Sequence, residues 1–286
     1  MNWFKVEEID QSEFRDQIMN LVRSQEISCI DAVPMLSGER KNSKPIIIHT
    51  DGNNVDAALF FTSYGRIIPV LDPGFLFHQE DVNHVSKLVG NSVFFPTSVS
   101  GKSEAVEMFL DRFSCGQRKK ILEHYIMELA QASFKMPQVP DQLKIRILRG
   151  SKRQLIPLFP LQKSYERQEV LLNPDAQETI ETFRWLKSIL TKEICFYAKR
   201  GFRYVSKANT NAKGFDHIQI GGVFTTKRFR NQGYALQTVA ALCRCIIEEE
   251  HKTPSLFVRC DNENAIKLYK SLGFEIKETT KTVYLD

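Results

Sequence analysis

The chain has 286 residues, of which 42% are hydrophobic, and its formal net charge is +5 at pH 7. This length exceeds one typical domain and suits two. The chain contains no apolar run long enough to span a membrane, and its start, M-N-W-F-K-V-E-E, lacks the apolar core of a signal peptide. We therefore expect a globular cytoplasmic protein of two domains.

Cysteine and charge patterns narrow the functional class further. The six cysteines show neither a CxxC pair nor the spacing of a disulfide framework, so we expect reduced, partly buried thiols. Residues 1–140 carry 14 Lys and Arg against 18 Asp and Glu, whereas residues 141–286 carry 25 against 16. The basic second half suits an anionic ligand such as a phosphorylated cofactor. Its basic residues are scattered and no nucleic-acid motif is present, so nucleic acid is an unlikely partner.

The first half alternates short apolar runs with helical patterns. We predict strands at 46–49, 57–61, 67–71 and 92–95, and helices at 11–23 (Ser12 as a possible N-cap), 80–89 and 103–113. The run 119–130 is compatible with either a strand or a helix. The stretch S-V-S-G-K-S at 98–103 resembles a phosphate loop, but the position of its first glycine holds Pro96. We expect a polar loop there, with Ser100 or Ser103 capping a helix.

A proline-rich linker, 136–141, separates the halves and predicts a boundary between domains 1–140 and 141–286. After it we predict a strand at 143–148 and a helix at 155–165 that begins late or breaks at its prolines. A further helix opens at Asn173-Pro174 and buries Ile180, Phe183, Leu186, Ile189 and Leu190. Strands at 194–198 and 204–207 precede a polar turn at 209–214.

The stretch from Ile220 to Ala235 (I-G-G-V-F-T-T-K-R-F-R-N-Q-G-Y-A) combines a strand end, a basic loop and a helix start. The N–H groups of a first helical turn lack partners, and the helix dipole is positive there. Gly233 allows a close backbone approach. A helix over 233–249 and a strand at 256–260 would complete a βαβ unit with parallel strands. The sequence therefore predicts an anion site at the carboxyl end of the first strand.

The last helix is predicted within D-N-E-N-A-I-K-L-Y-K-S-L-G-F, residues 261–274. Asn262 can cap its start, and Gly273 suits the left-handed position after its end, with Phe274 packing back on the last turn. Segments 275–279 and 282–285 would form a terminal hairpin.

Two of these motifs resemble signatures of the GNAT acetyltransferase superfamily. They are R-x-x-G-x-A at 230–235 and N-x-x-A-x-x-L-Y-x-x-L-G-F at 262–274, in the order in which the family has them. The resemblance implies an α/β fold with a mixed sheet and a GNAT acetyltransferase domain at 141–286. The half 1–140 resembles a smaller, degenerate GNAT-like domain, as in tandem members.

The resemblance also implies a site for acetyl-CoA or coenzyme A, where strand 216–225 splays from strand 256–260. Gly221 and Gly222 suit a bulge or a close backbone approach there, although they can equally be packing glycines. The implied cofactor-binding residues are Val223, Phe224 and Thr225 along the pantetheine, Arg230, Asn231, Gln232, Gly233, Tyr234 and Ala235 around the pyrophosphate, and Asn262 near the pantetheine arm or the strand end. The Val223 N–H would polarise the thioester carbonyl. Tyr269 would protonate the leaving thiolate, or serve only as a core residue.

The residue that acts as general base toward the acceptor amine stays open. Many family members have a glutamate where this chain has Gln219, which cannot take a proton, and His217 lies two residues earlier on the same face. We expect direct attack by a small-molecule or protein amine in a ternary complex, with no metal, in a monomer or possible homodimer. The alternative is a catalytically lapsed module that binds or senses acyl-CoA.

Overall fold

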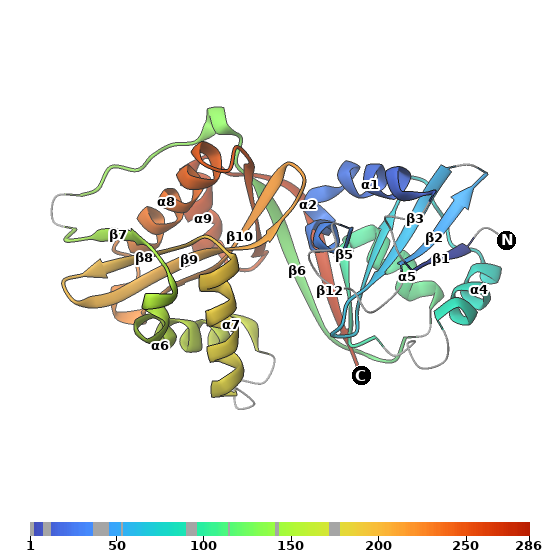
Figure 1. Ribbon diagram of the computed structural model, residues 1–286, viewed down its shortest axis with the longest axis horizontal. Helices are drawn as coiled ribbons and strands as arrows, with labels where there is room; N and C mark the ends of the chain where they lie inside the picture. The colour runs from blue at the N-terminus through green and yellow to red at the C-terminus, as the bar shows by residue number, and fades with distance from the viewer. Residues whose placement is uncertain are drawn as a thin grey trace. The chain divides into compact units, whose positions relative to one another are not determined.

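A computed structural model of the chain describes residues 3–7, 13–36, 46–52, 54–89, 96–113, 115–140, 143–171 and 178–286. The chain divides into two compact units (Figure 1). The first unit comprises Met1–Ile126, Val258–Asp261 and Lys277–Asp286, and the second comprises Met127–Phe257 and Asn262–Ile276. The units therefore interleave along the sequence, and the domain boundary at residue 140 stays a prediction. Ser12, the segment 92–95, Asp141 and Asn173-Pro174 lie outside the described residues.

The sheet of the first unit has the strand order β1-β2-β3-β4-β5-β12-β6. Its strands are β1 (Trp3–Val6), β2 (Ile46–Asp51), β3 (Asn54–Phe61), β4 (Arg66–Leu71), β5 (Ser98–Lys102), β12 (Glu275–Leu285) and β6 (Arg118–Glu128). The predicted strands at 46–49 and 57–61 are confirmed as parts of β2 and β3, which pair antiparallel, and the ambiguous run 119–130 is a strand. The predicted terminal hairpin is wrong, because β12 is one continuous strand that pairs antiparallel with β5 from Thr280 to Tyr284.

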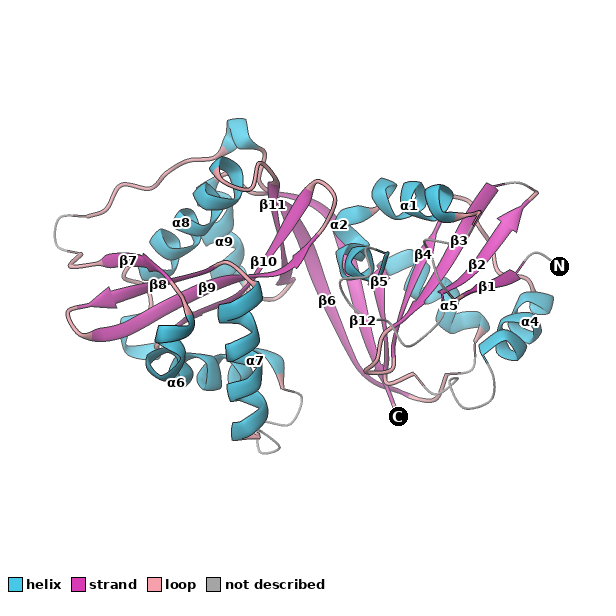
Figure 2. Cartoon of the chain, viewed as in Figure 1, coloured by secondary structure: helices cyan, strands magenta, loops and turns pink. Residues whose placement is uncertain are grey.

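The helices of the first unit are α1 (Arg15–Ser24), α2 (Glu26–Cys29), α3 (Val33–Leu36), α4 (Gln79–Val89) and α5 (Ser103–Arg112). Figure 2 shows α1 and α4 beside the magenta strands. Helices α4 and α5 close one face of the sheet over a core in which Phe109 and Phe113 stack at 4.4 Å. Helix α1 contacts β3 and β4. Burial of these aromatic side chains is the main source of stability in this unit.

The expected polar loop at 98–103 is wrong, because residues 98–102 form strand β5. This strand pairs parallel with β4 and antiparallel with β12, and Val99 is fully buried. Two ladders satisfy its backbone groups, so the short polar side chains do not prevent strand formation. Ser103 begins α5 and donates a hydrogen bond to the Thr279 carbonyl, at 3.1 Å, instead of capping the helix.

The sheet of the second unit has the strand order β11-β10-β9-β8-β7. Its strands are β7 (Arg146–Arg149), β8 (Cys195–Arg200), β9 (Arg203–Lys213), β10 (His217–Thr225) and β11 (Thr253–Arg259). The predicted parallel pairing of β10 with β11 is confirmed. The polar turn predicted at 209–214 is wrong, because β9 continues to Lys213 and the sheet buries the polar side chains of Asn209 and Thr210.

Helices α6 (Leu155–Tyr165) and α7 (Thr179–Lys192) cover the sheet from one side, and α8 (Tyr234–Glu248) covers it from the other, with α9 (Glu263–Leu272) beside α8 (Figure 1). The expected break in α6 does not occur. Pro157 lies in the first turn, where its missing N–H is not needed, and packing of Leu158 and Leu161 holds the helix through Pro160. In α7, Leu186, Ile189 and Leu190 are buried as predicted, but Ile180 and Phe183 are exposed.

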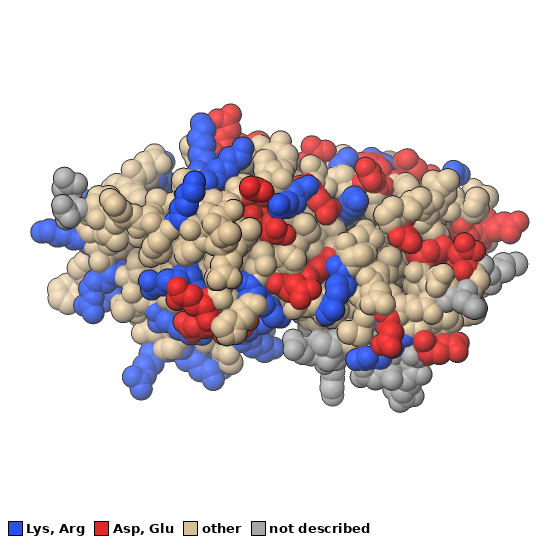
Figure 3. Space-filling model, turned by 90° about the horizontal axis from the view of Figure 1, so that it is seen from above, with Lys and Arg blue, Asp and Glu red and all other residues tan. Residues whose placement is uncertain are grey.

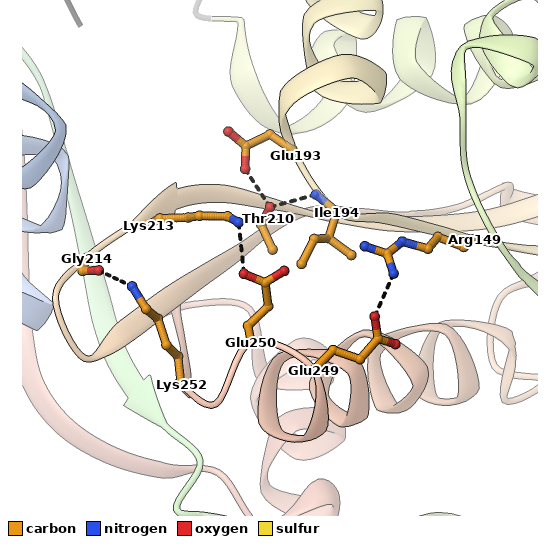
Figure 4. Close-up of polar contacts among 9 residues, drawn as sticks. All are labelled: Arg149, Glu193, Ile194, Thr210, Lys213, Gly214, Glu249, Glu250 and Lys252. Carbon is orange, nitrogen blue, oxygen red and sulfur yellow. Dashed lines mark hydrogen bonds and ion pairs between the residues drawn. The ribbon is translucent and has the colours of Figure 1, made fainter. Parts of the chain in front are cut away.

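The end of α8 is tied to the sheet by ion pairs and hydrogen bonds (Figure 4). Glu249 pairs with Arg149 of β7 at 2.7 Å, and Glu250 pairs with Lys213 of β9 at 3.0 Å. Lys252 donates to the Gly214 carbonyl at 2.6 Å. Each contact is individually weak at the surface, and together they hold the end of α8 against β7 and β9.

Both predicted ends of α9 are confirmed. Asn262 Oδ1 accepts a hydrogen bond from the Ala265 N–H at 3.2 Å and caps the helix. Gly273 adopts φ +102° after the last turn, and the Phe274 N–H donates to the Tyr269 carbonyl at 3.1 Å. The caps leave α9 with a fixed start and end, which places Tyr269 in its last full turn.

Candidate active site

The loop between β10 and α8 has the backbone geometry of an anion site. Asn231 has φ +58° and Gly233, the N-cap of α8, has φ +84°. No side chain caps this helix start. The N–H groups of the first turn therefore point toward the loop with the positive end of the helix dipole behind them. Such a helix start accommodates a phosphate group.

Side-chain contacts hold this loop in place. Arg230 Nε donates to the Thr225 carbonyl at 3.0 Å, and its guanidinium lies 5.5 Å from the centre of the Phe224 ring. Phe229 and Tyr234 are buried and meet edge to face at 5.9 Å. Tyr234 can thus contribute only its backbone to a ligand, while its ring anchors the start of α8.

Strand β10 leaves its ladders at the same end. Its pairing with β11 runs from His217 to Ile220 and stops there. Its pairing with β9 passes from Gly221 opposite Asn209 directly to Phe224 opposite Lys207. Two residues, Gly222 and Val223, therefore stand opposite one residue of β9, which is a β-bulge. The bulge frees backbone groups of β10 for a ligand next to the loop.

The two glycines of the bulge are required by close side chains of β9. A Cβ on Gly221 would lie 1.9 Å from Asn211 Nδ2. A Cβ on Gly222, which has φ +58°, would lie 2.1 Å from Asn209 Oδ1 and 2.8 Å from Lys207 Nζ. Both separations are too short for any real contact. The register confirms the expected bulge, the short separations to β9 side chains fit the alternative of packing glycines, and the close approach to a cofactor stays a prediction.

We predict that Gly222→Ala destabilises the second unit by more than the strain of a positive φ alone. Gly201 provides a matched control, because it has φ +59° and no atom within 4 Å of its missing Cβ. Gly201→Ala should cost about 1–2 kcal/mol of unfolding free energy, and Gly222→Ala at least about 2 kcal/mol more, because the bulge must shift. Denaturant unfolding of both variants measures the difference. Equal losses would contradict the close approach.

Tyr269 lies on α9 with its ring buried and edge to face with Phe274 at 5.7 Å. Burial raises the pKa of its hydroxyl well above the ordinary value, with smaller contributions from Tyr165 and Cys243. The hydroxyl therefore keeps its proton throughout the neutral range. Asn262 uses its Oδ1 in the α9 cap, so its amide nitrogen is the part that can reach a ligand.

The two candidates for the base differ in surroundings. Gln219 is buried on β10 before the bulge. His217 Nε2 lies 3.1 Å from Glu128 Oε2, so this histidine is paired with a carboxylate. Both lie on β10, as predicted, at the end where β10 and β11 still pair.

Sequence reasoning missed a buried group beside the bulge, formed by Lys207, Tyr165 and Glu166. Lys207 is completely buried, its Nζ lies 5.1 Å from the centre of the Tyr165 ring, and burial lowers its pKa from 10.5 to about 8. The Tyr165 hydroxyl accepts a hydrogen bond from the Gly222 N–H, and burial raises its pKa to about 12. The alternating polar residues at 207, 209 and 211 are the available signal, but the sequence prediction ends a strand at 207 and places 209 and 211 in a turn.

We predict that Lys207→Met changes the pH dependence of stability. Below pH 8 the ammonium is charged in both states and its burial is costly. Between pH 8 and 10.5 the unfolded chain binds the extra proton, so the wild type gains stability as pH rises. The advantage of the methionine variant should therefore shrink by up to about 3 kcal/mol over this range.

Unfolding free energies at pH 7 and pH 10.5 measure this effect. Lys199→Met is the matched control, because Lys199 lies 5.0 Å from the Tyr204 ring centre but is not fully buried. A pH-independent difference between Lys207→Met and wild type would contradict the lowered pKa.

Charge and composition around the site agree with an anionic ligand. In the space-filling view, blue Lys and Arg side chains gather over the second unit (Figure 3).

Among the described residues, no group of three or more His, Cys, Asp and Glu could hold a metal ion. All six cysteines are free. The described part of the chain has no helix that is long and apolar enough to cross a membrane.

Comparisons with known proteins identify the fold. Residues 216–284 match the model of the family described as FR47-like protein. A GNAT-family acetyltransferase from Colwellia psychrerythraea has a TM-score of 0.61 at 11% identity and covers 100% of both chains. A GCN5-related N-acetyltransferase from Sphaerobacter thermophilus has a TM-score of 0.60 at 13% identity and covers 98% of this chain and 94% of its own.

A tandem GNAT protein from the clavulanic acid biosynthesis pathway, whose structure was solved without AcCoA, also resembles the whole chain. Its TM-score is 0.58 at 12% identity, and the match covers 99% of this chain and 98% of the other. No curated protein matches the sequence. The predicted GNAT fold is therefore confirmed, and it extends over both halves of the chain.

Proposed function

We propose that this protein is an N-acetyltransferase that uses acetyl-CoA and transfers the acetyl group directly to an amine. The observation that carries this proposal is the bulge of β10, which leads through the loop 226–232 into helix α8, whose start at Gly233 has no side-chain cap. The backbone of β10 at the bulge can therefore bind the amide groups of the pantetheine arm, and the start of α8 can bind the phosphates. The GNAT fold of the chain supports the same function.

The residues of the site divide the work as follows. Backbone N–H groups of Asn231 to Ala235 hold the pyrophosphate, and Arg230, whose N–H donates to the Lys227 carbonyl at 3.3 Å, holds the start of this loop. The backbone of β10 from Val223 to Thr225 positions the pantetheine arm. The bound acetyl-CoA supplies the acetyl group as a thioester. The Val223 N–H polarises its carbonyl, and the Tyr269 hydroxyl gives its proton to the leaving sulfur. The high pKa of Tyr269 suits an acid that must remain protonated at neutral pH.

A second candidate function is a lapsed module that binds acyl-CoA without transferring the acyl group. It is favoured by Gln219, an amide in the position where many family members have a glutamate. Both candidates share the site for the nucleotide, so binding alone does not distinguish them. They differ in amine-dependent turnover.

Binding tests the part that both candidates share. We predict that coenzyme A binds once per chain, with all contacts from residues 141–286. At a hundred times its dissociation constant it should stabilise the fold by about 2.7 kcal/mol. Calorimetric titration gives the stoichiometry, and a thermal melt gives the stabilisation. Absence of a thermal shift at millimolar acetyl-CoA, or a second site within residues 1–140, would contradict the proposal.

A further inference from the structure

A stripe of polar side chains passes under the bulge of β10. We call Lys207, Asn209 and Asn211 the polar stripe. They alternate along β9 and so share one face of the strand. Lys207 Nζ donates to Asn209 Oδ1 at 2.8 Å, and Asn209 Nδ2 donates to Asn211 Oδ1 at 3.1 Å. Lys207 and Asn209 are fully buried and Asn211 is exposed, so the stripe leads from the interior to the surface.

The polar stripe lies directly against the strand proposed to hold the thioester. The missing Cβ of Gly222 would lie 2.8 Å from Lys207 Nζ, and Gly222 immediately precedes Val223. A primary amine is therefore placed beside the backbone that polarises the carbonyl. Any side chain at residue 222 would displace it.

The ionisable groups around Lys207 come from three elements. The Tyr165 ring faces it from α6, Glu166 follows in the next turn, and Cys195 lies on β8. Tyr197 is opposite Lys207 in the β8–β9 register. The oxygens of Glu166 already accept hydrogen bonds from Gln162, at 2.9 Å, and from Thr182. Among the described residues, Asn209 Oδ1 is the only hydrogen-bond acceptor of Lys207 Nζ.

This environment lowers the pKa of the Lys207 amine, so that it can gain and lose a proton near neutral pH. Burial disfavours the ammonium, and the one amide acceptor and the nearby carboxylate compensate only in part. With a pKa of about 8, a large fraction is neutral in mildly alkaline solution. A base works best when its pKa lies near the working pH.

We propose that Lys207, as the neutral amine, is the base that takes the proton from the acceptor nitrogen. This inference rests on the proposed N-acetyltransferase function. The proton passes from the ammonium of the acceptor to Nζ, so the acceptor becomes a neutral nucleophile and Lys207 an ammonium facing Asn209 and Glu166. As the N–C bond forms and the C–S bond breaks, Tyr269 gives a proton to the sulfur, and the second proton released by the acceptor nitrogen restores the Tyr269 hydroxyl. Lys207 then returns its proton to solvent.

The test compares the wild type, Lys207→Met and the control Lys199→Met. Values of kcat/KM are measured from pH 6 to pH 10 by thiol release from acetyl-CoA. The acceptors are the primary alkylamine that the wild type acetylates best and hydroxylamine, which is neutral at pH 7. A second readout is the NMR titration of lysines labelled with 13C at Cε, in which the Lys207 signal is identified by its absence from Lys207→Met.

We expect Lys207→Met to lose about 10²–10⁴-fold in kcat/KM for the alkylamine near pH 8 and much less for hydroxylamine. The fall of the rate toward acid, centred near pH 8 in the wild type, should move in the variant to the higher pKa of the alkylamine itself, because only its neutral form then reacts. The coenzyme A thermal shift and the Lys199→Met profile should be unchanged. The Lys207 signal should titrate near pH 8.

The inference alone is overturned if the wild type acetylates amines but the fall of the rate centred near pH 8 survives in Lys207→Met. It is also overturned if the Lys207 signal titrates only near the ordinary lysine pKa. Equal losses for both acceptors, with an unchanged pH profile, would show a purely structural role and would also overturn it. If no amine gives thiol release above background, the proposed function is overturned, and this inference with it.

Discussion

Gly233→Asp should abolish the thermal shift that coenzyme A produces, while the protein remains folded. A Cβ at Gly233 would meet only Leu143 Cδ2, at 3.5 Å, so the side chain has room. Aspartate tolerates the left-handed conformation of this residue better than most side chains. Its carboxylate would stand at the helix start, where the pyrophosphate is proposed to bind, and would repel it. Differential scanning fluorimetry with and without coenzyme A measures the result.

Gly233→Asn is the matched control. It has the same shape and the same tolerance for positive φ but no charge. We expect it to weaken binding by about tenfold or less, compared with a loss beyond detection in Gly233→Asp. Full retention of the coenzyme A shift in Gly233→Asp would show that the phosphates do not bind at the start of α8.

Tyr269→Phe should keep coenzyme A affinity and lose turnover. The phenyl ring still packs edge to face on Phe274, so the fold and the end of α9 should remain. Only the hydroxyl is removed, and general acid catalysis typically contributes about 10²–10⁴-fold, so kcat should fall on that scale. Steady-state kinetics with an acetylated amine measure kcat and KM separately.

Tyr204→Phe is a suitable control, because Tyr204 is partly buried in the second unit, stacks on Tyr197 and is not among the groups around Lys207. It should leave kcat within about twofold of the wild type, as expected for a residue outside the chemistry. An undiminished kcat in Tyr269→Phe would show that Tyr269 is a core residue and that the thiolate obtains its proton elsewhere.

Where local chemistry decides the structure, the sequence was sufficient to predict it. Asn262 and Gly273 end α9 as expected, because capping depends on a few neighbouring residues. Gly233 at the start of α8 was predictable for the same reason, since its left-handed backbone suits glycine. The backbone at the start of α8 was therefore predictable, and the anion site there stays a prediction.

Where tertiary contacts decide the structure, sequence reasoning failed. Residues 209–213 have turn composition, but the ladder with β10, the end of the ladder with β8 at Asn209 and the hydrogen bonds of Asn209 keep them in β9. Pro160 stays within α6 because buried leucines outweigh the lost backbone bond. The strand β12 depends on its pairing with β5, far away in the sequence. Lys207 was missed for the same reason. Its burial depends on the full length of β9 and on Gly221 and Gly222 of the neighbouring strand β10.

Amine-dependent release of free thiol from acetyl-CoA tests the central claim most directly. The purified chain is incubated with acetyl-CoA and a panel of amines that includes amino acids, polyamines, aminoglycosides and lysine peptides. A thiol reagent follows the rate, and mass spectrometry confirms the acetylated product. We predict thiol release that requires a particular class of amine and that falls in Tyr269→Phe. Coenzyme A binding by a folded protein, with no thiol release above background for any amine, would contradict the claim and indicate an acyl-CoA-binding module.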